Sequence, residues 1–302
     1  MTGPAEHPAA ATTAGTHARL DALGRVGDPV ALRRTLPLRV EFARQIRRRR
    51  TQAVAALVLL LPILIALAFR IGGDDDSGGG PALLDVATTG AGNFALFTVY
   101  VAVGFLLVVM VALFCGDSVA SEASWSSLRY LLAIPVPRAR LLRQKLIVAL
   151  TLSFLAQLLL PVWAFVVGGA FFGWGPVESP LGGTFGWGEA LSRLAIVLLY
   201  SCGQSLVVAG LAFLLSVLTD APLGAVGGSV LLVIVSNILD SITALDPYRQ
   251  FLPTHFQYSW VDALGPEVVW DDMMRGTGLA LVYAAIFLAA AWISFERKDI
   301  TS

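Results

Sequence analysis

Six long apolar runs constrain this chain more than any other feature of its sequence. They cover residues 53–71, 94–116, 146–172, 190–217, 223–239 and 277–295. Even the shortest run would reach roughly 25 Å as a helix at about 1.5 Å per residue, close to the ~30 Å hydrocarbon core of a bilayer. Each run therefore predicts a membrane-spanning helix. Pro62 and Pro161 lie inside the first and third runs and predict a kink in each.

The composition excludes several other classes of protein. Of the 302 residues, 56% are hydrophobic and 14% are charged, whereas soluble domains are about 25% charged. A mean hydropathy of +0.74 also excludes a disordered chain and a nucleic-acid-binding protein, because both classes are polar and rich in charge. We therefore expect an all-α integral membrane protein that contacts membrane lipids and no nucleic acid.

The residues before the first run divide into two parts. Residues 1–28 are small and polar without hydrophobic periodicity, and they predict a flexible tail with no signal peptide. Residues 29–302 then form one transmembrane domain. Its first part places Leu38, Phe42 and Ile46 four residues apart among many arginines, which predicts an amphipathic helix at the membrane interface.

The basic residues predict the orientation of the chain. Seventeen of the 21 Lys and Arg residues lie before the first run, between the second and third runs, or after the last run. Positive residues gather on the cytoplasmic side, so we expect both termini in the cytoplasm. The four arginines at 47–50 are either only such an orientation signal or also make a specific contact, and the two roles are compatible. Four tryptophans near the opposite boundary predict an interfacial aromatic belt: Trp174, Trp187, Trp260 and Trp270.

The loop at 117–145 is the most informative segment outside the runs. Residues 118–132 can form a helix with one side that carries Ser118, Glu122, Ser126 and Arg129. The Pro-Val-Pro sequence at 135–137 ends it, because a proline forces the preceding residue out of the α region. We expect this helix on the cytoplasmic surface with Glu122 exposed, so that Glu122→Arg alters partner docking and leaves insertion intact. A plain topological loop is the alternative.

Seven positions in this loop follow a recognisable order: an acid, then Glu, a small residue and Leu, then Pro, Arg and a Lys that opens the third run. They are Asp117, Glu122, Ser127, Leu128, Pro135, Arg138 and Lys145. In this order the chain resembles the permease subunits of ATP-binding cassette (ABC) transporters of the type-2 exporter family, over about residues 30–302. The resemblance implies a cytoplasmic coupling helix with the ATPase-coupling residues Asp117, Glu122, Leu128, Arg129, Pro135 and Arg138.

The resemblance also implies partner chains. A phosphate-binding loop needs Gly-Lys followed by Ser or Thr, but the two lysines stand in Gln-Lys-Leu and Arg-Lys-Asp. ATP and Mg would therefore be bound by another polypeptide. The resemblance implies two ABC ATPase subunits and a second permease chain, identical or different, in a bacterial plasma membrane. The expected function is export of a hydrophobic or amphipathic substrate; the alternative is a non-transporting membrane assembly or anchor protein.

Few polar residues lie inside the runs. The three histidines fall outside them, so we expect no catalytic site, no metal and no cofactor in this chain. The candidates for a translocation path are Gln157, Ser201, Gln204, Asn237 and Asp240. Hydrogen bonding between helices is the favoured role of these residues, and contact with a substrate is the alternative.

Two of the predicted connections differ in character. Residues 241–276 are long, apolar and aromatic, and they either dip back into the outer leaflet as short helices, as the resemblance implies, or lie on the lipid headgroups. Residues 173–188 contain six glycines, which predicts only a flexible connection.

Overall fold

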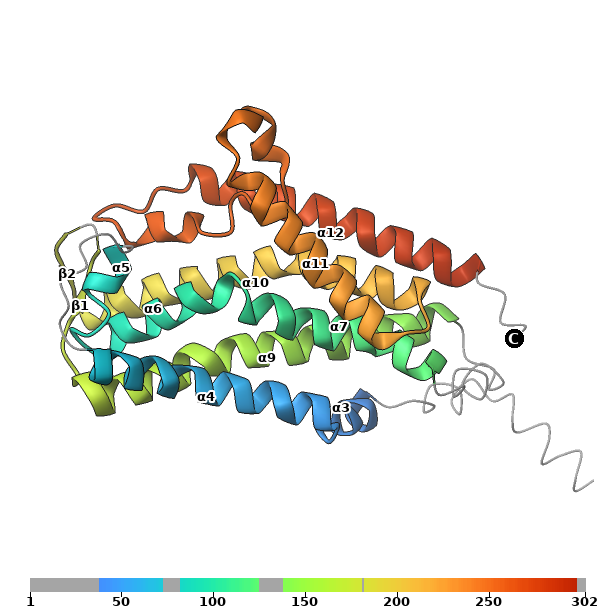
Figure 1. Cartoon of the computed structure of the whole chain (residues 1–302), viewed down its shortest axis with the longest axis horizontal. Coiled ribbons are helices and arrows are strands. Elements are labelled where there is room, and N and C mark those ends of the chain that lie inside the picture. Colours follow the sequence, from blue (N-terminus) through green and yellow to red (C-terminus); the bar gives the residue numbers. More distant parts are fainter. Residues whose placement is uncertain (1–37, 73–81, 125–137, 181, 298–302) are drawn as a thin grey trace, which may run out of the picture.

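The computed structural model describes residues 38–72, 82–124, 138–180 and 182–297, and most of these residues are helical (Figure 1). The long helices are α4 (Arg49–Gly72), α6 (Ala91–Val103), α7 (Leu106–Ser124), α9 (Arg138–Phe172), α10 (Trp187–Leu218), α11 (Pro222–Asp240) and α12 (Asp271–Arg297). The short elements are α3 (Leu38–Ile46), α5 (Ala82–Asp85), the strands β1 (Val177–Glu178) and β2 (Thr184–Phe185), and the 3-10 helices η2 (Thr243–Leu245), η3 (Tyr248–Phe251) and η4 (Ser259–Leu264).

The long helices have the length and apolar character of membrane spans. In the described parts of the chain, α4, α9, α10, α11 and α12 each pass that test, and α6 with α7 adds a sixth span if the bent pair counts as one. Pro62 and Pro161 lie inside helices that continue on both sides. Large apolar side chains such as Leu199 and Leu223 point outward, 75% and 83% exposed. The structure is therefore that of an all-α, multi-pass membrane protein.

The second predicted span is not one helix, which corrects the expected run at 94–116. α6 and α7 are separate helices with axes that differ by 58°. At the break, a Cβ on Gly104 would lie 2.7 Å from the Tyr258 hydroxyl. Tyr258 also packs on Tyr100, with ring centroids 5.0 Å apart. The close approach of Tyr258 accounts for the glycine at this position, and apolar periodicity does not reveal such a break.

Helices α7 and α10 form the centre of the bundle. α10 packs against α7, α11 and α12, while α7 also packs against α9 and α11. α4 and α6 pack on α9. Large side chains from several of these helices are completely or almost completely buried between them, among them Phe94, Met110, Leu160 and Phe213.

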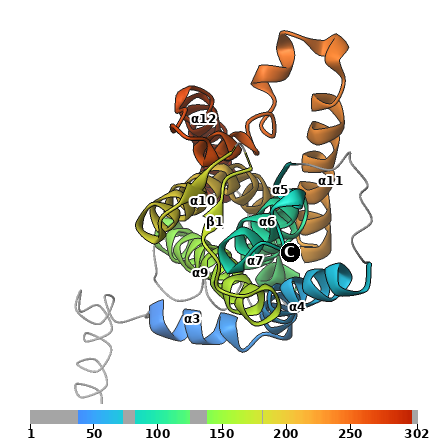
Figure 2. The ribbon, with the colours of Figure 1, turned by 90° about the vertical axis from the view of Figure 1, so that its left-hand side faces the viewer.

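The bundle has two different ends (Figure 1). The hairpin end carries α5, the strands β1 and β2, and η4, whereas the other end, which we call the α3 end, carries α3 and the C-terminal ends of α7 and α12. α3 lies across the bundle and not along it (Figure 2). The described segments that the sequence predicts on the cytoplasmic side therefore share one end of the molecule.

The connection at 173–188 is ordered, which corrects the prediction that it is only a flexible connection. β1 and β2 pair antiparallel and bury Val177 and Phe185 in the helical core. The Asn93 side chain bonds the carbonyl oxygen and the N–H group of Glu178, at 2.7 and 2.9 Å. Several glycines of this segment have the positive φ angles of tight turns. These glycines form ordered turns, and amino-acid composition alone does not distinguish ordered turns from flexible linkers.

The segment at 241–276 contains the three 3-10 helices and packs back on the bundle. Trp260 is completely buried, and Tyr200 of α10 donates a hydrogen bond to the Phe256 carbonyl oxygen at 2.6 Å. The burial of Trp260 corrects its assignment to an interfacial belt, because its ring packs inside the chain. The other three tryptophans of the predicted belt are exposed: Trp174, Trp187 and Trp270.

Candidate functional site

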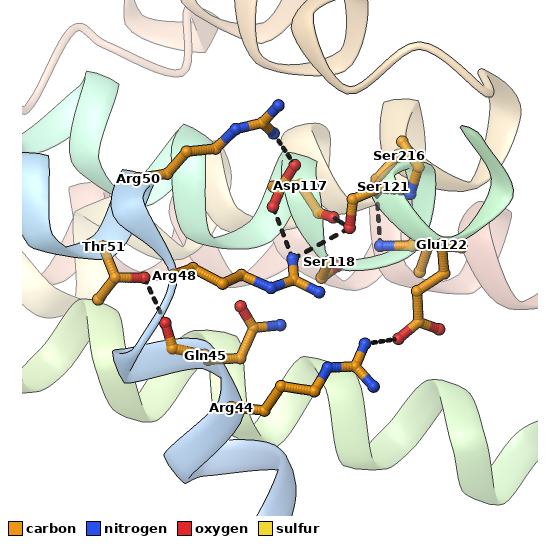
Figure 3. A network of polar contacts seen from close by, with 12 residues as sticks. Arg44, Gln45, Arg48, Arg50, Thr51, Asp117, Ser118, Ser121, Glu122 and Ser216 are labelled. Atoms are coloured by element: carbon orange, nitrogen blue, oxygen red, sulfur yellow. Dashed lines mark hydrogen bonds and ion pairs between the residues drawn. The ribbon is translucent and has the colours of Figure 1, made fainter. Parts of the chain in front are cut away.

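Two of the predicted coupling residues meet a group of arginines at the α3 end of the bundle (Figure 3). We call this network the ionic junction, and its members are Glu41, Arg44, Arg48, Arg50, Asp117, Glu122 and Lys145. α3, the turn after it and the start of α4 supply the first four residues, α7 supplies the two acids that follow, and α9 supplies the lysine. The junction therefore joins the crosswise helix to the ends of two long helices.

One half of the junction centres on Glu122. Its Oε1 lies 2.6 Å from Nζ of Lys145 and 2.5 Å from Nη2 of Arg44. The side chains of Glu122 and Lys145 are each 3% exposed, whereas that of Arg44 is 47% exposed. Glu41 lies 3.7 Å from both cations. A buried carboxylate is thus held between a buried and a half-exposed cation, and such a charge is tolerated in the interior only when it is paired.

The other half of the junction centres on Asp117. Arg48 donates a hydrogen bond to this carboxylate at 2.8 Å, and Arg50 contacts its second oxygen. Arg48 also donates to Ser121 at 3.1 Å. On the α10 side, Ser216 Oγ accepts hydrogen bonds from two backbone N–H groups of α7, at 3.0 and 2.9 Å. The end of α7 is therefore held by arginines on one side and by α10 on the other.

The position of Glu122 corrects the expectation that it is exposed on a separate surface helix. α7 runs without a break from Leu106 to Ser124, so Glu122 belongs to the end of a long helix. Its side chain is buried because Lys145 of α9 neutralises it in direct contact. The substitution Glu122→Arg would place a third cation beside Arg44 and Lys145. We therefore expect it to impair folding, contrary to the expectation from the sequence.

The remaining predicted coupling residues adjoin the junction in the chain. Leu128, Arg129 and Pro135 fall within 125–137, outside the described residues. Arg138 is the first residue of α9. The segment 125–137 therefore begins directly after α7 and ends directly before α9, the two helices that the pair of Glu122 and Lys145 connects.

The sequence did not assign the arginines of the junction or Glu41. The run at 47–50 left two interpretations open, and the structure supports the specific contact, because Arg48 and Arg50 both bind Asp117. A signal for this pairing exists in the sequence. Asp117 directly follows the second apolar run and the arginines at 47–50 precede the first run, so all of them are predicted on the same side of the membrane. Charged side chains at the edge of the hydrocarbon are stable mainly when they form ion pairs.

The chemistry of the junction follows from its charges. Each of its three carboxylates lies within 4 Å of two cations. Within the described ranges of the chain, no group of three or more His, Cys, Asp and Glu residues could hold a metal ion. The junction can therefore connect helices and transmit a displacement of one helix to another.

The predicted path residues form two groups, and the first lies on α9 and α10. Gln157 donates a hydrogen bond to Ser205 at 3.1 Å, which links the two helices. Ser201 and Gln204 lie one turn apart on α10 and line a cavity of about 290 Å³. The favoured role of bonding between helices is thus seen for Gln157, whereas Ser201 and Gln204 border a space.

Asn237 and Asp240 form the second group, near the end of α11. Gln257 donates a hydrogen bond to Asn237 Oδ1 at 2.9 Å, and His255 Nδ1 lies 2.5 Å from Asp240 Oδ1. Neither Asn237 nor Asp240 lines the cavity. Both residues instead attach the segment at 241–276 to α11.

Comparison with known proteins gives a family and no activity. No curated protein matches the chain. A family model described as "Protein of unknown function (DUF2705)" matches residues 82–301. That stretch is well over half of the chain and includes Asp117, Glu122 and Lys145, whereas α3 and α4 precede it. The chain therefore belongs to the DUF2705 family.

Proposed function

We propose that this chain is a permease subunit of an ATP-driven ABC exporter. It would act with a second permease chain and with two separate ATPase subunits, which bind ATP and Mg. The observation that carries the proposal is the ionic junction. Its buried pair of Glu122 and Lys145 connects the helices on either side of the segment 125–137. This segment holds Leu128, Arg129 and Pro135, three of the residues that the resemblance to type-2 exporters assigns to coupling.

The arrangement of the two ends supports a six-span topology with both termini in the cytoplasm of a bacterial cell. The basic residues of α3 and the start of α4 gather at the end where α7 and α12 terminate (Figure 1), and positive residues favour the cytoplasmic side. A helix that lies across the bundle beside the spans also fits a position at the membrane interface. A cysteine at Ser77 should then react with an impermeant thiol reagent in intact cells, and one at Ser126 should not.

The packing of α7 suggests how coupling would work. A partner that moves the segment 125–137 would displace α7 and α9, because both are continuous with it. α7 packs on α10 and α11, so the displacement would reach half of the bundle. The junction would make α3 and the start of α4 follow, since Arg44, Arg48 and Arg50 are bound to acids of α7.

The test is purification of the tagged, full-length chain from its native membrane at native expression level. We expect an ABC ATPase to co-purify in stoichiometric amount. ATP hydrolysis should be found in the same fractions as that subunit at every purification step. The chain made in a host without the partner should neither bind nor hydrolyse ATP. Absence of any ATPase from the native complex would overturn the proposal and favour the non-transporting assembly or anchor protein.

Two charge-reversal variants test whether the segment 125–137 contacts the ATPase. Arg129→Glu lies in the segment 125–137 and should abolish co-purification of the ATPase while the permease remains in the membrane. Arg275→Glu is the matched control, because Arg275 lies in the first turns of α12 with a side chain that is 72% exposed. It should retain the ATPase. If both variants retain the ATPase equally, the segment 125–137 is not the coupling element.

A further inference from the structure

The cavity beside Ser201 lies between four long helices. Its lining includes Val108 of α7, Val233 of α11 and Phe287 of α12, together with the face of α10 that carries Ser201. Seen along the bundle, α11 and α12 lie on different sides (Figure 2), and they make little direct contact. Leu232 borders the cavity on α11 and is 49% exposed. The cavity therefore reaches the apolar flank of the bundle beside α11.

The lining of the cavity is mostly apolar, with polar residues on α10 and on the segment at 241–276. Ser201, Gln204 and Ser205 lie on α10, and Gln257 borders the cavity from the segment at 241–276. Ser201 is 6% exposed, and its buried Oγ has no hydrogen-bond partner among the described residues. Buried polar atoms are normally hydrogen-bonded, and a serine hydroxyl can both donate and accept. A single polar group of a ligand would satisfy this hydroxyl after rotation about χ1.

The lining carries no formal charge. None of the residues that border the cavity is Asp, Glu, Lys, Arg or His. Two charged side chains of the neighbouring segment already have partners, since His255 contacts Asp240 and Arg249 contacts Asp246. A charged ligand in this cavity would lose its hydration without gaining a counter-charge, which is strongly unfavourable.

We propose that this cavity is a binding site for an uncharged amphiphile, a molecule with an apolar body and one hydroxyl or ester oxygen that bonds Ser201. The volume of about 290 Å³ is just below the roughly 300–1,000 Å³ of small-molecule sites. It accommodates an acyl segment or a small ring system with its polar group, and not a whole phospholipid. The site lies within one chain, so its test needs no second permease and no ATP, and its failure is distinguishable from failure of the proposed exporter function.

The experiment uses the purified, full-length chain in lipid nanodiscs without ATP or partners. The probe is a monoacylglycerol with a photoreactive diazirine and an alkyne in its acyl chain. We expect cross-links to concentrate at 103–108, 201–211 and 232–233. Unlabelled monoacylglycerol should compete at least about tenfold better than the fatty acid of equal length at pH 9 or an alkyltrimethylammonium ion, because both of those carry a charge.

Three variants distinguish binding of the probe in the cavity from binding on the lipid-facing surface. Leu211→Trp fills the cavity from its α10 wall and should lower cross-linking at least about tenfold. Ser201→Ala removes only the hydroxyl and should weaken competition about fivefold, the loss of one net hydrogen bond. Ser192→Ala removes an exposed hydroxyl from the same helix, far from the cavity, and should behave as wild type.

Three results would overturn the proposal. Cross-links spread evenly over lipid-facing positions such as Val162 and Leu199 would show membrane partitioning without a site. Charged competitors as effective as the monoacylglycerol would exclude the uncharged class. Wild-type cross-linking in a folded Leu211→Trp variant, checked by gel filtration and thermal unfolding, would place the probe elsewhere. If this variant does not fold, the competition series on the wild-type chain still decides the question.

Discussion

The two ends of the bundle are held together by different interactions. At the α3 end, long charged side chains bind one another in the ionic junction. At the hairpin end, side chains bind mainly backbone groups: Asn93 bonds Glu178, Ser179 donates to the Leu264 carbonyl oxygen at 2.6 Å, and Arg193 donates to that of Ala263 at 2.7 Å. Arg193 also forms an ion pair at 2.9 Å with Glu189, but the Glu189 side chain is 47% exposed. The loss of one member of a buried ion pair leaves the opposite charge unpaired, whereas a backbone carbonyl remains a neutral acceptor. The α3 end should therefore depend more strongly on single side chains.

The largest expected effect is at Lys145. Lys145→Met keeps the length of the side chain and removes the charge, so Glu122 stays buried and loses its buried cation, while the half-exposed Arg44 remains beside it. We expect a loss of about 3–5 kcal/mol in the free energy of unfolding, as for other buried pairs that lose one partner. The measurement is the thermal unfolding midpoint of the purified chain in detergent.

The matched control removes both charges. Glu122→Leu combined with Lys145→Met leaves no unpaired charge in the interior, so the double variant should recover much of the lost stability. A double variant as unstable as the sum of both single variants would contradict pairing as the cause. It would instead indicate loss of packing at these two positions.

The next effect in size is expected at the hairpin end. Arg193→Met retains the aliphatic stem and loses the hydrogen bonds to the carbonyl oxygens of Ala263 and Pro266, at 2.7 and 3.3 Å. It also loses the ion pair with the half-exposed Glu189 and the contact with the Phe185 ring, at 5.3 Å from its centroid. The expected cost is about 2 kcal/mol, because hydrogen bonds from a charged donor contribute roughly 1.5–3 kcal/mol. If Arg193→Met lowers the free energy of unfolding in the same detergent as much as Lys145→Met or more, the α3 end does not depend more strongly on single side chains than the hairpin end.

A smaller effect at the α3 end tests a neutral contact. Ser216→Ala removes the oxygen that accepts two N–H groups of α7, which remain within a helix. We expect a loss of about 1 kcal/mol, typical of a neutral hydrogen bond. Denaturant unfolding followed by tryptophan fluorescence can resolve it. A loss close to that of Lys145→Met would mean that the whole α3 end is fragile and not its charges alone.

The smallest effect is expected for an exposed ion pair. Arg275 lies 3.8 Å from Asp272, with side chains 72% and 52% exposed. Arg275→Ala should change the free energy of unfolding by less than about 0.5 kcal/mol, since exposed pairs are screened by water and salt. This variant shows whether the large effect of Lys145→Met comes from the burial of its ion pair or from the loss of a charge as such. A shift above about 1 kcal/mol would argue against that explanation.

The helices could be predicted from the sequence, and several of their details could not. The apolar runs located every long helix, because length and hydropathy are local properties. The break at Gly104 depends on Tyr258, which is far along the chain, and so left no local signal. The hairpin was missed because glycines in ordered turns have the same composition as glycines in linkers. Trp260 was assigned to the wrong environment, since its position in the chain does not show that it packs inside the bundle.

The candidate site could be predicted in part. Glu122 and Lys145 were singled out, but their direct contact and their burial were not expected. The partners of Asp117 are separated from it by more than sixty residues, and which arginines it binds is set by the way α3 and α4 meet α7. Ser201 and Gln204 were named as polar residues within a span. That they border a cavity depends on the separation of α11 from α12, which a single sequence does not encode in any local pattern.

The break between α6 and α7 gives the second span two different attachments. Both helices pack on α9, but α6 also packs on β1, whereas α7 packs chiefly on α10 and α11. Bending of a continuous helix distorts successive backbone hydrogen bonds, but at Gly104 that series is already interrupted. A load on α7 should therefore bend this pair of helices at Gly104 before it bends either helix. The two helices then behave as stiff rods with a joint between them, and α9 is a neighbour that both rods share.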